Sequence, residues 1–284
     1  MFSRLLKHEW RSSSGLLGLL SLAAGGIGVL ATVVLRILVN FSEELLDTLG
    51  DWAVVVMSAL SMFLFFSVVA LSVYAIAVQV ILLYRFYKNK FTDEGYLTFT
   101  LPVKTTHIFW SSFLNMLIWL LISLVVVAAV IFLAVFVGTA KDGLVNMDIF
   151  DDIKQTLDML SLADWDVLFS EKLVVPYLIV MALTVLTTPL YALIVPMACI
   201  TAGAVLAKKH KILASFGVYY GLNFVVGIVT AVANVVPSIL TLGNGDMGGY
   251  YVTSGTIQLV ITVALTVGAY FFTTHVMKKK LNLP

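Results

Sequence analysis

Residues 105–138 read TTHIFWSSFLNMLIWLLISLVVVAAVIFLAVFVG, a run that contains no Asp, Glu, Lys or Arg. An apolar stretch of about 20 residues already crosses the ~30 Å hydrocarbon core of a bilayer as an α-helix. This run is therefore predicted to span a membrane. The rest of the chain has a similar character, since 61% of its 284 residues are hydrophobic and only 12% are charged. A water-soluble domain of this length needs many more charged residues to cover its surface.

Five further apolar runs have the length of a membrane span. Together with the first, the predicted spans are Ser14–Leu38, Ala53–Tyr84, Thr105–Gly138, Leu173–Ala207, Ile212–Ile239 and Gly255–Thr274. We therefore predict an all-α membrane protein whose residues 1–284 form a single transmembrane domain. The second run is longer than the hydrocarbon core, so its helix is expected to tilt strongly or to project from the membrane.

The basic residues predict the orientation of these spans. If both termini lie on one side, the 17 basic residues divide 13 to 4 between the two sides of the membrane. The larger group is Arg4, Lys7, Arg11, Arg85, Lys88, Lys90, Lys104, Lys208, Lys209, Lys211, Lys278, Lys279 and Lys280, and the smaller is Arg36, Lys141, Lys154 and Lys172. Cytoplasmic loops are the ones rich in Lys and Arg. We expect a multi-pass protein of the cell membrane with both termini in the cytoplasm.

The segments between the spans predict smaller elements. Residues 1–13 place apolar and basic side chains on opposite helical faces, which predicts a helix lying in the membrane interface; a basic flank without such a role is the alternative. The acidic outer loop, residues 139–172, contains an amphipathic pattern over Ile149, Ile153, Leu157 and Leu160. The glycine-rich stretch Pro237–Gly255 is expected to be a loop or a partly re-entrant segment. Pro189 and Pro196 should bend or break the fourth span.

A charged island, RFYKNKFTDEGYLTFTLPVK at residues 85–104, separates the second and third spans. Thr92 can cap a helix, and Asp93 and Glu94 would complement the dipole of its first turn. Pro102 disfavours helical geometry at the residue before it and so ends the helix. The island therefore predicts a short cytosolic helix near residues 93–101, which either meets a protein partner or rests on lipid headgroups.

In this island the sequence resembles the ABC type-2 permease family, the membrane halves of exporters driven by a separate ATPase. The resemblance rests on the basic stretch Arg85–Lys90, Asp93-Glu94-Gly95, the aromatic run Tyr96–Thr100, and Leu101-Pro102-Val103 before the third span. It implies six spans, an N-terminal interfacial helix and a coupling helix that docks on a cytosolic ABC ATPase. The residues expected to contact the ATPase are Arg85, Asp93, Glu94, Tyr96 and Phe99.

Two spans carry polar residues on one helical face. Asn223, Thr230 and Asn234 share a face of the fifth span, and Ser58, Ser72 and Gln79 follow a seven-residue spacing on the second. Placing an amide in hydrocarbon costs free energy unless the amide is hydrogen-bonded to another group or to water. Such faces should therefore meet a partner helix or a cavity. The resemblance implies that both spans line a substrate path between two permease subunits, as a homodimer or a heterodimer. Close helix packing is the alternative.

The sequence contains no motif typical of nucleotide binding or of zinc-dependent catalysis. There is no phosphate-binding Gly-x-x-x-x-Gly-Lys-[Ser/Thr] loop and no His-Glu-x-x-His zinc motif, and the four histidines are far apart. We expect no catalytic residue, no metal site and no nucleic-acid partner, with ATP and Mg bound by the partner ATPase. Alternative functions are a non-transporting membrane protein that binds a ligand or confers immunity, and a secondary transporter. The second is weakened because no ionisable residue lies deep in a span.

Overall fold

A computed structural model of the protein describes residues 2–40, 50–92, 95, 104–140, 149–155, 174–207, 209–242 and 247–279. Within these ranges the regular structure is helical and contains no strand. Six of the described helices are long and apolar enough to cross a membrane, which confirms the predicted all-α, multi-pass fold.

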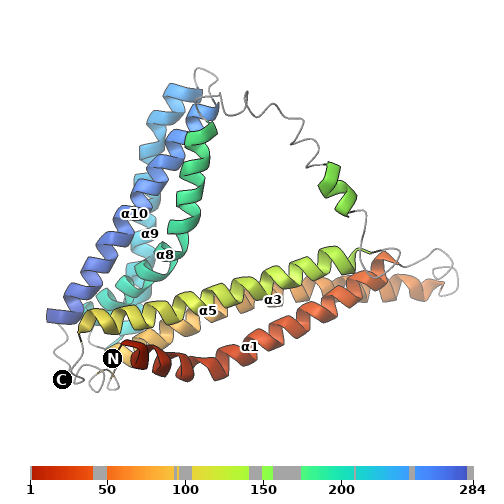
Figure 1. The fold of residues 1–284 in the computed structure, drawn as a ribbon, viewed down its shortest axis with the longest axis horizontal. Helices are drawn as coiled ribbons and strands as arrows, with labels where there is room; N and C mark the ends of the chain where they lie inside the picture. Colours follow the sequence, from red (N-terminus) through yellow and green to blue (C-terminus); the bar gives the residue numbers. More distant parts are fainter. Residues whose placement is uncertain are drawn as a thin grey trace. The chain divides into compact units, whose positions relative to one another are not determined.

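The six long helices follow the chain order of the predicted spans (Figure 1). They are α1 (Phe2–Val39), α3 (Asp51–Phe91), α5 (Thr105–Leu133), α8 (Val174–Leu206), α9 (Lys211–Pro237) and α10 (Met247–Lys279). Two short π-helices, η1 (Ala134–Gly138) and η2 (Ser238–Leu242), continue α5 and α9. A further helical segment covers residues 149–155.

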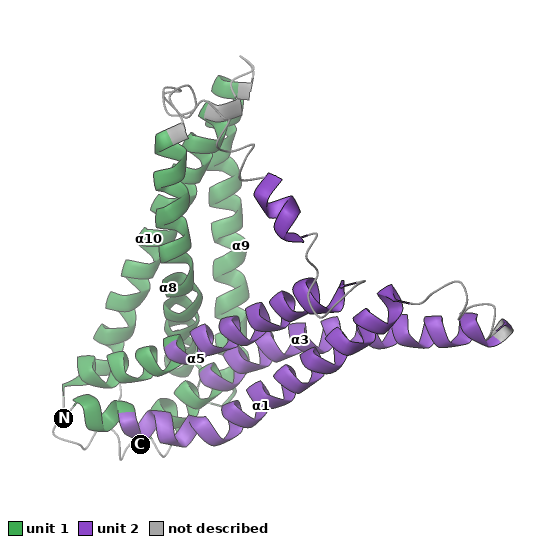
Figure 2. Ribbon diagram, turned by 45° about the vertical axis from the view of Figure 1, so that its right-hand side comes forward, with its two compact units in different colours: residues 1–6, 83–117, 163–284 green, residues 7–82, 118–162 purple. Residues whose placement is uncertain are grey.

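The chain divides into two compact units, which Figure 2 colours green and purple. Unit 1 contains residues 1–6, 83–117 and 163–284, and unit 2 contains residues 7–82 and 118–162. The helices α3 and α5 each contribute one end to unit 1 and the remainder to unit 2. The single transmembrane domain expected from the sequence stays a prediction.

Unit 1 is built around α8, which packs against both α9 and α10. A Cβ added to Gly203 of α8 would lie only 2.2 Å from Ser215 Oγ of α9, so the two backbones approach closely at this point. The start of α5 packs on α10 through aromatic rings, with the Phe109 and Tyr270 centroids 5.3 Å apart. The chain's beginning joins the same end of the unit, since the Phe2 ring lies 6.1 Å from that of His107.

Unit 2 holds α1 against α3 and α5 through polar contacts between mostly apolar helices. The hydroxyls of Ser21 and Tyr74 are 2.8 Å apart, which joins α1 to α3. Directly after α1, Asn40 Nδ2 donates to the carbonyl of Ala140, which follows η1, at 2.8 Å. Each of these contacts gives a polar group a hydrogen-bond partner that neither lipid tails nor apolar side chains could provide.

Two helices run further than the uncharged stretches that predicted them. The predicted interfacial segment, residues 1–13, is helical from Phe2 and continues without a break into the first span. At the other boundary, α3 continues past Arg85 and Lys88 as far as Phe91. Charged residues indicate where a helix leaves the hydrocarbon core of the membrane, but they do not indicate where the helix ends. The helix can continue into water because its backbone hydrogen bonds are made within the helix.

Two further expectations concern the prolines and a glycine-rich stretch. Pro189 and Pro196 lie inside α8, which changes direction along its length but does not break, in keeping with the first of the two predicted alternatives (Figure 1). The expectation of a loop over Pro237–Gly255 was wrong, because η2 and the start of α10 occupy most of it, and the alternative of a partly re-entrant segment stays a prediction. A Cβ on Gly255 would lie 3.0 Å from Val180 Cγ1, so this glycine permits close packing of α10 on α8.

The acidic outer loop is described only in part. Its residues 149–155 are helical, which agrees with the amphipathic helix predicted there. The side chain of Phe150 in this segment packs against Phe136 of η1, with ring centroids 5.5 Å apart. Leu157 and Leu160, the other two apolar positions of the predicted helix, lie outside the described residues.

Candidate functional site

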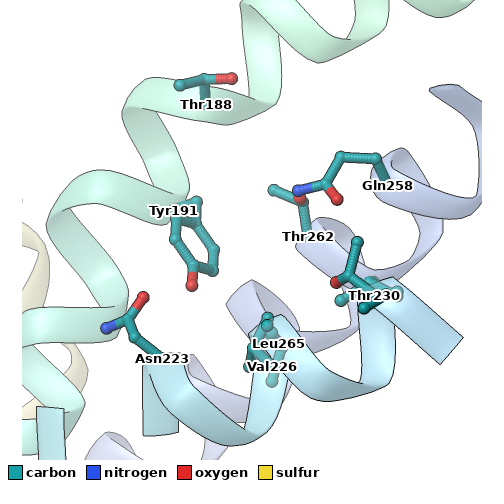
Figure 3. Close-up of a pocket in the computed structure, with 11 residues that line it drawn as sticks. Thr188, Tyr191, Asn223, Val226, Thr230, Gln258, Thr262 and Leu265 are labelled. Carbon is teal, nitrogen blue, oxygen red and sulfur yellow. The ribbon is translucent and has the colours of Figure 1, made fainter. Parts of the chain in front are cut away.

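A cavity of about 660 Å³ lies between α8, α9 and α10 in unit 1 (Figure 3). Its volume is within the range of about 300–1,000 Å³ that small-molecule sites occupy. The lining residues come from all three helices and are Thr188, Tyr191, Asn223, Val226, Gly227, Thr230, Ala231, Gln258, Ile261, Thr262 and Leu265. The cavity is partly open.

The cavity lies near the middle of each helix that forms it. Tyr191 is close to the centre of α8, and Val226 and Thr262 are close to the centres of α9 and α10. In a helix that crosses a bilayer, these central positions lie at the depth of the hydrocarbon core. Polar groups at this depth are costly unless a partner, water or a ligand satisfies them.

Six of the lining side chains can make hydrogen bonds, and all six are uncharged. Figure 3 shows the Tyr191 ring reaching from α8 into the space between the helices, with its hydroxyl on the side where Asn223 lies. Tyr191 and Asn223 are half-buried, whereas Gln258 of α10 is exposed and Thr262 is buried. The site therefore offers hydroxyls and amides from three helices to one shared volume.

Some of this hydrogen-bonding capacity is used within single helices. Asn223 Nδ2 donates to the carbonyl of Tyr219 at 2.8 Å, and Thr188 Oγ1 donates to that of Thr184 at 2.7 Å. Among the described residues, Gln258 makes no side-chain hydrogen bond, and the Tyr191 hydroxyl makes none. The Gln258 amide, the Tyr191 hydroxyl and the Asn223 oxygen are thus available to a bound molecule.

The three residues predicted on the fifth span differ in whether they line the cavity. Asn223 and Thr230 line the cavity, as the shared polar face of this span predicts. Asn234, one turn further along, does not line it. Its Nδ2 donates to the carbonyl of Thr230 at 2.8 Å, while its Oδ1 is buried and has no hydrogen-bond partner among the described residues.

The three predicted residues of the second span lie in unit 2, on α3. Ser58, Ser72 and Gln79 are all exposed, and the two serine hydroxyls donate to carbonyls of their own helix. The opposite face of α3 contains the buried Ser67 and Tyr74. The described structure therefore gives this polar row a free face within its unit.

The predicted ATPase-contact residues are described only at Arg85, which lies in α3. Asp93, Glu94, Tyr96 and Phe99 lie outside the described residues. Between them, Gly95 donates its N–H to the carbonyl of Thr92 at 2.8 Å.

Gly95 also fits closely against the end of α3. A Cβ at this position would lie 2.6 Å from the carbonyl oxygen of Lys90, so no other residue type fits without a backbone shift. Next to it, Lys211 Nζ at the start of α9 donates to the carbonyl of Phe91 at 3.4 Å. The exit of α3 into the predicted coupling loop is thus tied directly to the helix whose middle lines the cavity.

Sequence patterns did not identify the residues that α8 and α10 contribute to the site. Tyr191 follows Thr184 and Thr188 at spacings of seven and three residues, and Gln258 is followed by Thr262 and Thr266 at spacings of four, so each shares a helical face with other polar residues. These two faces were not among the predicted site residues, although both lie in uncharged runs where an unpaired polar group is costly. Comparison of the chain with protein-family models, with curated proteins and with solved structures finds no match.

Proposed function

We propose that this chain is the membrane subunit of an ATP-driven exporter, which works with a cytosolic ABC ATPase and a second permease subunit. The observation that carries the proposal is the charged island at residues 85–104 with its acidic-Gly, aromatic and Leu101-Pro102-Val103 pattern. ATP and Mg bind to the partner ATPase in this scheme. The protein lies in the cell membrane with both termini in the cytoplasm, as the basic residues predict.

The contacts at the end of α3 support a mechanical role for this island. Lys211 begins α9 and donates to Phe91, the last residue of α3, so the two helix ends are held together. A force applied to the loop after Phe91 therefore reaches α9 directly. Three turns and more along the same helix, Asn223 and Thr230 line the cavity. ATP-driven closure of the partner can thereby alter the cavity without a charged residue in the membrane.

The proposal is tested by isolating the protein in mild detergent from its native host and measuring ATP hydrolysis by the proteins that co-purify. The wild type should retain an ATPase, and Tyr96→Ala with Phe99→Ala should lose it, because aromatic side chains commonly dominate such interfaces. Trp52→Ala is the matched control, since Trp52 is an exposed aromatic at the other end of α3. Retention of the ATPase by the double variant, or its absence from the wild type, would contradict the proposal.

A further inference from the structure

We propose that the cavity between α8, α9 and α10 binds an uncharged amphiphile whose polar head carries hydroxyl or amide groups and whose acyl chains stay in the bilayer. As a statement about the substrate, this inference rests on the proposed export function. Binding itself does not depend on export. All of its lining residues belong to unit 1 of a single copy of the chain.

The charge of the lining excludes an ionic head. None of the eleven lining residues is Asp, Glu, Lys, Arg or His. A phosphate or carboxylate brought to this depth would lose its hydration and find no Lys or Arg in return, which is prohibitive in a medium of low polarity. An ammonium group would lack a carboxylate for the same reason. The lining therefore selects against charged ligands.

The polar groups of the lining define what the site recognises. Gln258 supplies an amide with two N–H donors and one carbonyl acceptor, Tyr191 supplies a hydroxyl, and Asn223 supplies its oxygen. These groups come from three different helices and converge on one volume (Figure 3). A head with both donor and acceptor groups can satisfy them together. A purely apolar ligand would leave them unpaired, which costs binding free energy.

The shape of the cavity explains how such a molecule fits. Its polar groups come from three spans, and Val226, Ile261 and Leu265 supply an apolar part of the wall. Since the cavity is partly open, a head group can enter while its acyl chains extend outward among lipid tails. In this arrangement the head group can pair with the polar groups of the lining. The combination is typical of a site for a two-part ligand.

The test uses a diacylglycerol that carries a photoactivatable group on one acyl chain, with the purified full-length protein in phosphatidylcholine nanodiscs and no ATPase present. We expect saturable labelling that unlabelled diacylglycerol reduces by tenfold or more. Phosphatidate with the same acyl chains differs only by its anionic phosphate and should compete at least tenfold more weakly. Equal competition by phosphatidate would overturn the inference, and so would labelling that does not saturate.

Variants identify the site. Tyr191→Phe removes one hydroxyl and should weaken diacylglycerol binding several-fold, and Gln258→Leu should weaken it tenfold or more. Thr256→Val is the matched control on α10, because Thr256 is exposed, donates to the carbonyl of Val252 and does not line the cavity. Unchanged labelling of Gln258→Leu would overturn the assignment. Because no ATPase is present, a negative result here leaves the co-purification test intact, and the reverse also holds.

Discussion

The indole nitrogen of Trp119 in α5 donates a hydrogen bond to Ser13 Oγ in α1 at 3.0 Å, in the interior of unit 2. Ser13 is fully buried, and its hydroxyl donates in turn to the carbonyl of Glu9 at 3.0 Å. The ring of Trp119 also stacks on that of Trp10, with centroids 5.0 Å apart. One serine thus joins the predicted interfacial segment to the third span.

Removal of this serine hydroxyl should destabilise unit 2. In Ser13→Ala the buried Trp119 N–H loses its acceptor, and an unsatisfied buried donor costs about 1–3 kcal/mol. Thermal unfolding in detergent, followed by tryptophan fluorescence, should show a lower Tm. Ser14→Ala is the control, because Ser14 is only half-buried and its one hydrogen bond, to the carbonyl of Arg11, lies within its own helix. If both variants unfold at the same temperature, the bond contributes nothing to the stability of the fold.

A methyl group at Gly203 should disrupt unit 1. The added Cβ would lie 2.4 Å from the backbone nitrogen of Ser215, which a rotamer change cannot relieve. Overpacking of this kind typically costs about 1–3 kcal/mol. Gly217→Ala on α9 is the control, because no neighbouring atom lies within 4 Å of its added Cβ. We expect a lower Tm for Gly203→Ala only; an unchanged Tm would mean that α8 and α9 are not in close contact there.

Replacement by leucine should have opposite effects on stability at Asn234 of α9, whose Oδ1 is buried, and at the buried Asn115 of α5. Asn234→Leu removes an oxygen that is buried without a partner, so the stability of the isolated chain should rise or stay within about 1 kcal/mol. Asn115 is 4% exposed and does have a polar interaction, so Asn115→Leu should lower the Tm. A large loss of stability in Asn234→Leu would show that its oxygen has a partner, such as ordered water or a second subunit.

The orientation of the spans can be checked by cysteine labelling in a Cys199→Ala background, which removes the chain's single cysteine. A cysteine at Lys209, which is exposed, should react with a membrane-impermeant maleimide only after the cells are permeabilised. Cysteines at Lys141 and Asp246 should react in intact cells. The reverse pattern would invert the topology and would place the residue 85–104 loop outside the cell, away from any ATPase.

The six spans could be predicted because each one consists of at least 20 residues with almost no charge, and bilayer thickness makes that signal decisive. Their ends could not be predicted as well. Lys88 and Lys90 indicate the membrane boundary, whereas the helix of α3 ends at Phe91 only where Thr92 and Gly95 turn the chain. Glycines misled the prediction at Gly255, where the missing side chain serves helix packing and not a loop.

Of the candidate site, only the α9 wall was predicted. Asn223 and Thr230 lie seven residues apart, so one helical face contains both, and a single helix is sufficient to reveal the pattern. Tyr191 and Gln258 become part of the site because α8 and α10 place them beside that face. Such placement depends on the packing of three helices, and local periodicity contains no information about it.

The absence of charge from the cavity lining also determines how the site responds to membrane voltage. Moving one elementary charge across a potential of 100 mV involves about 2.3 kcal/mol, whereas moving an uncharged ligand involves no electrical work. A cell's resting potential therefore neither drives nor opposes passage of a neutral molecule through this site. For the proposed exporter, movement of the neutral ligand in sealed vesicles should therefore proceed at the same rate whether the membrane is polarised or short-circuited with an ionophore.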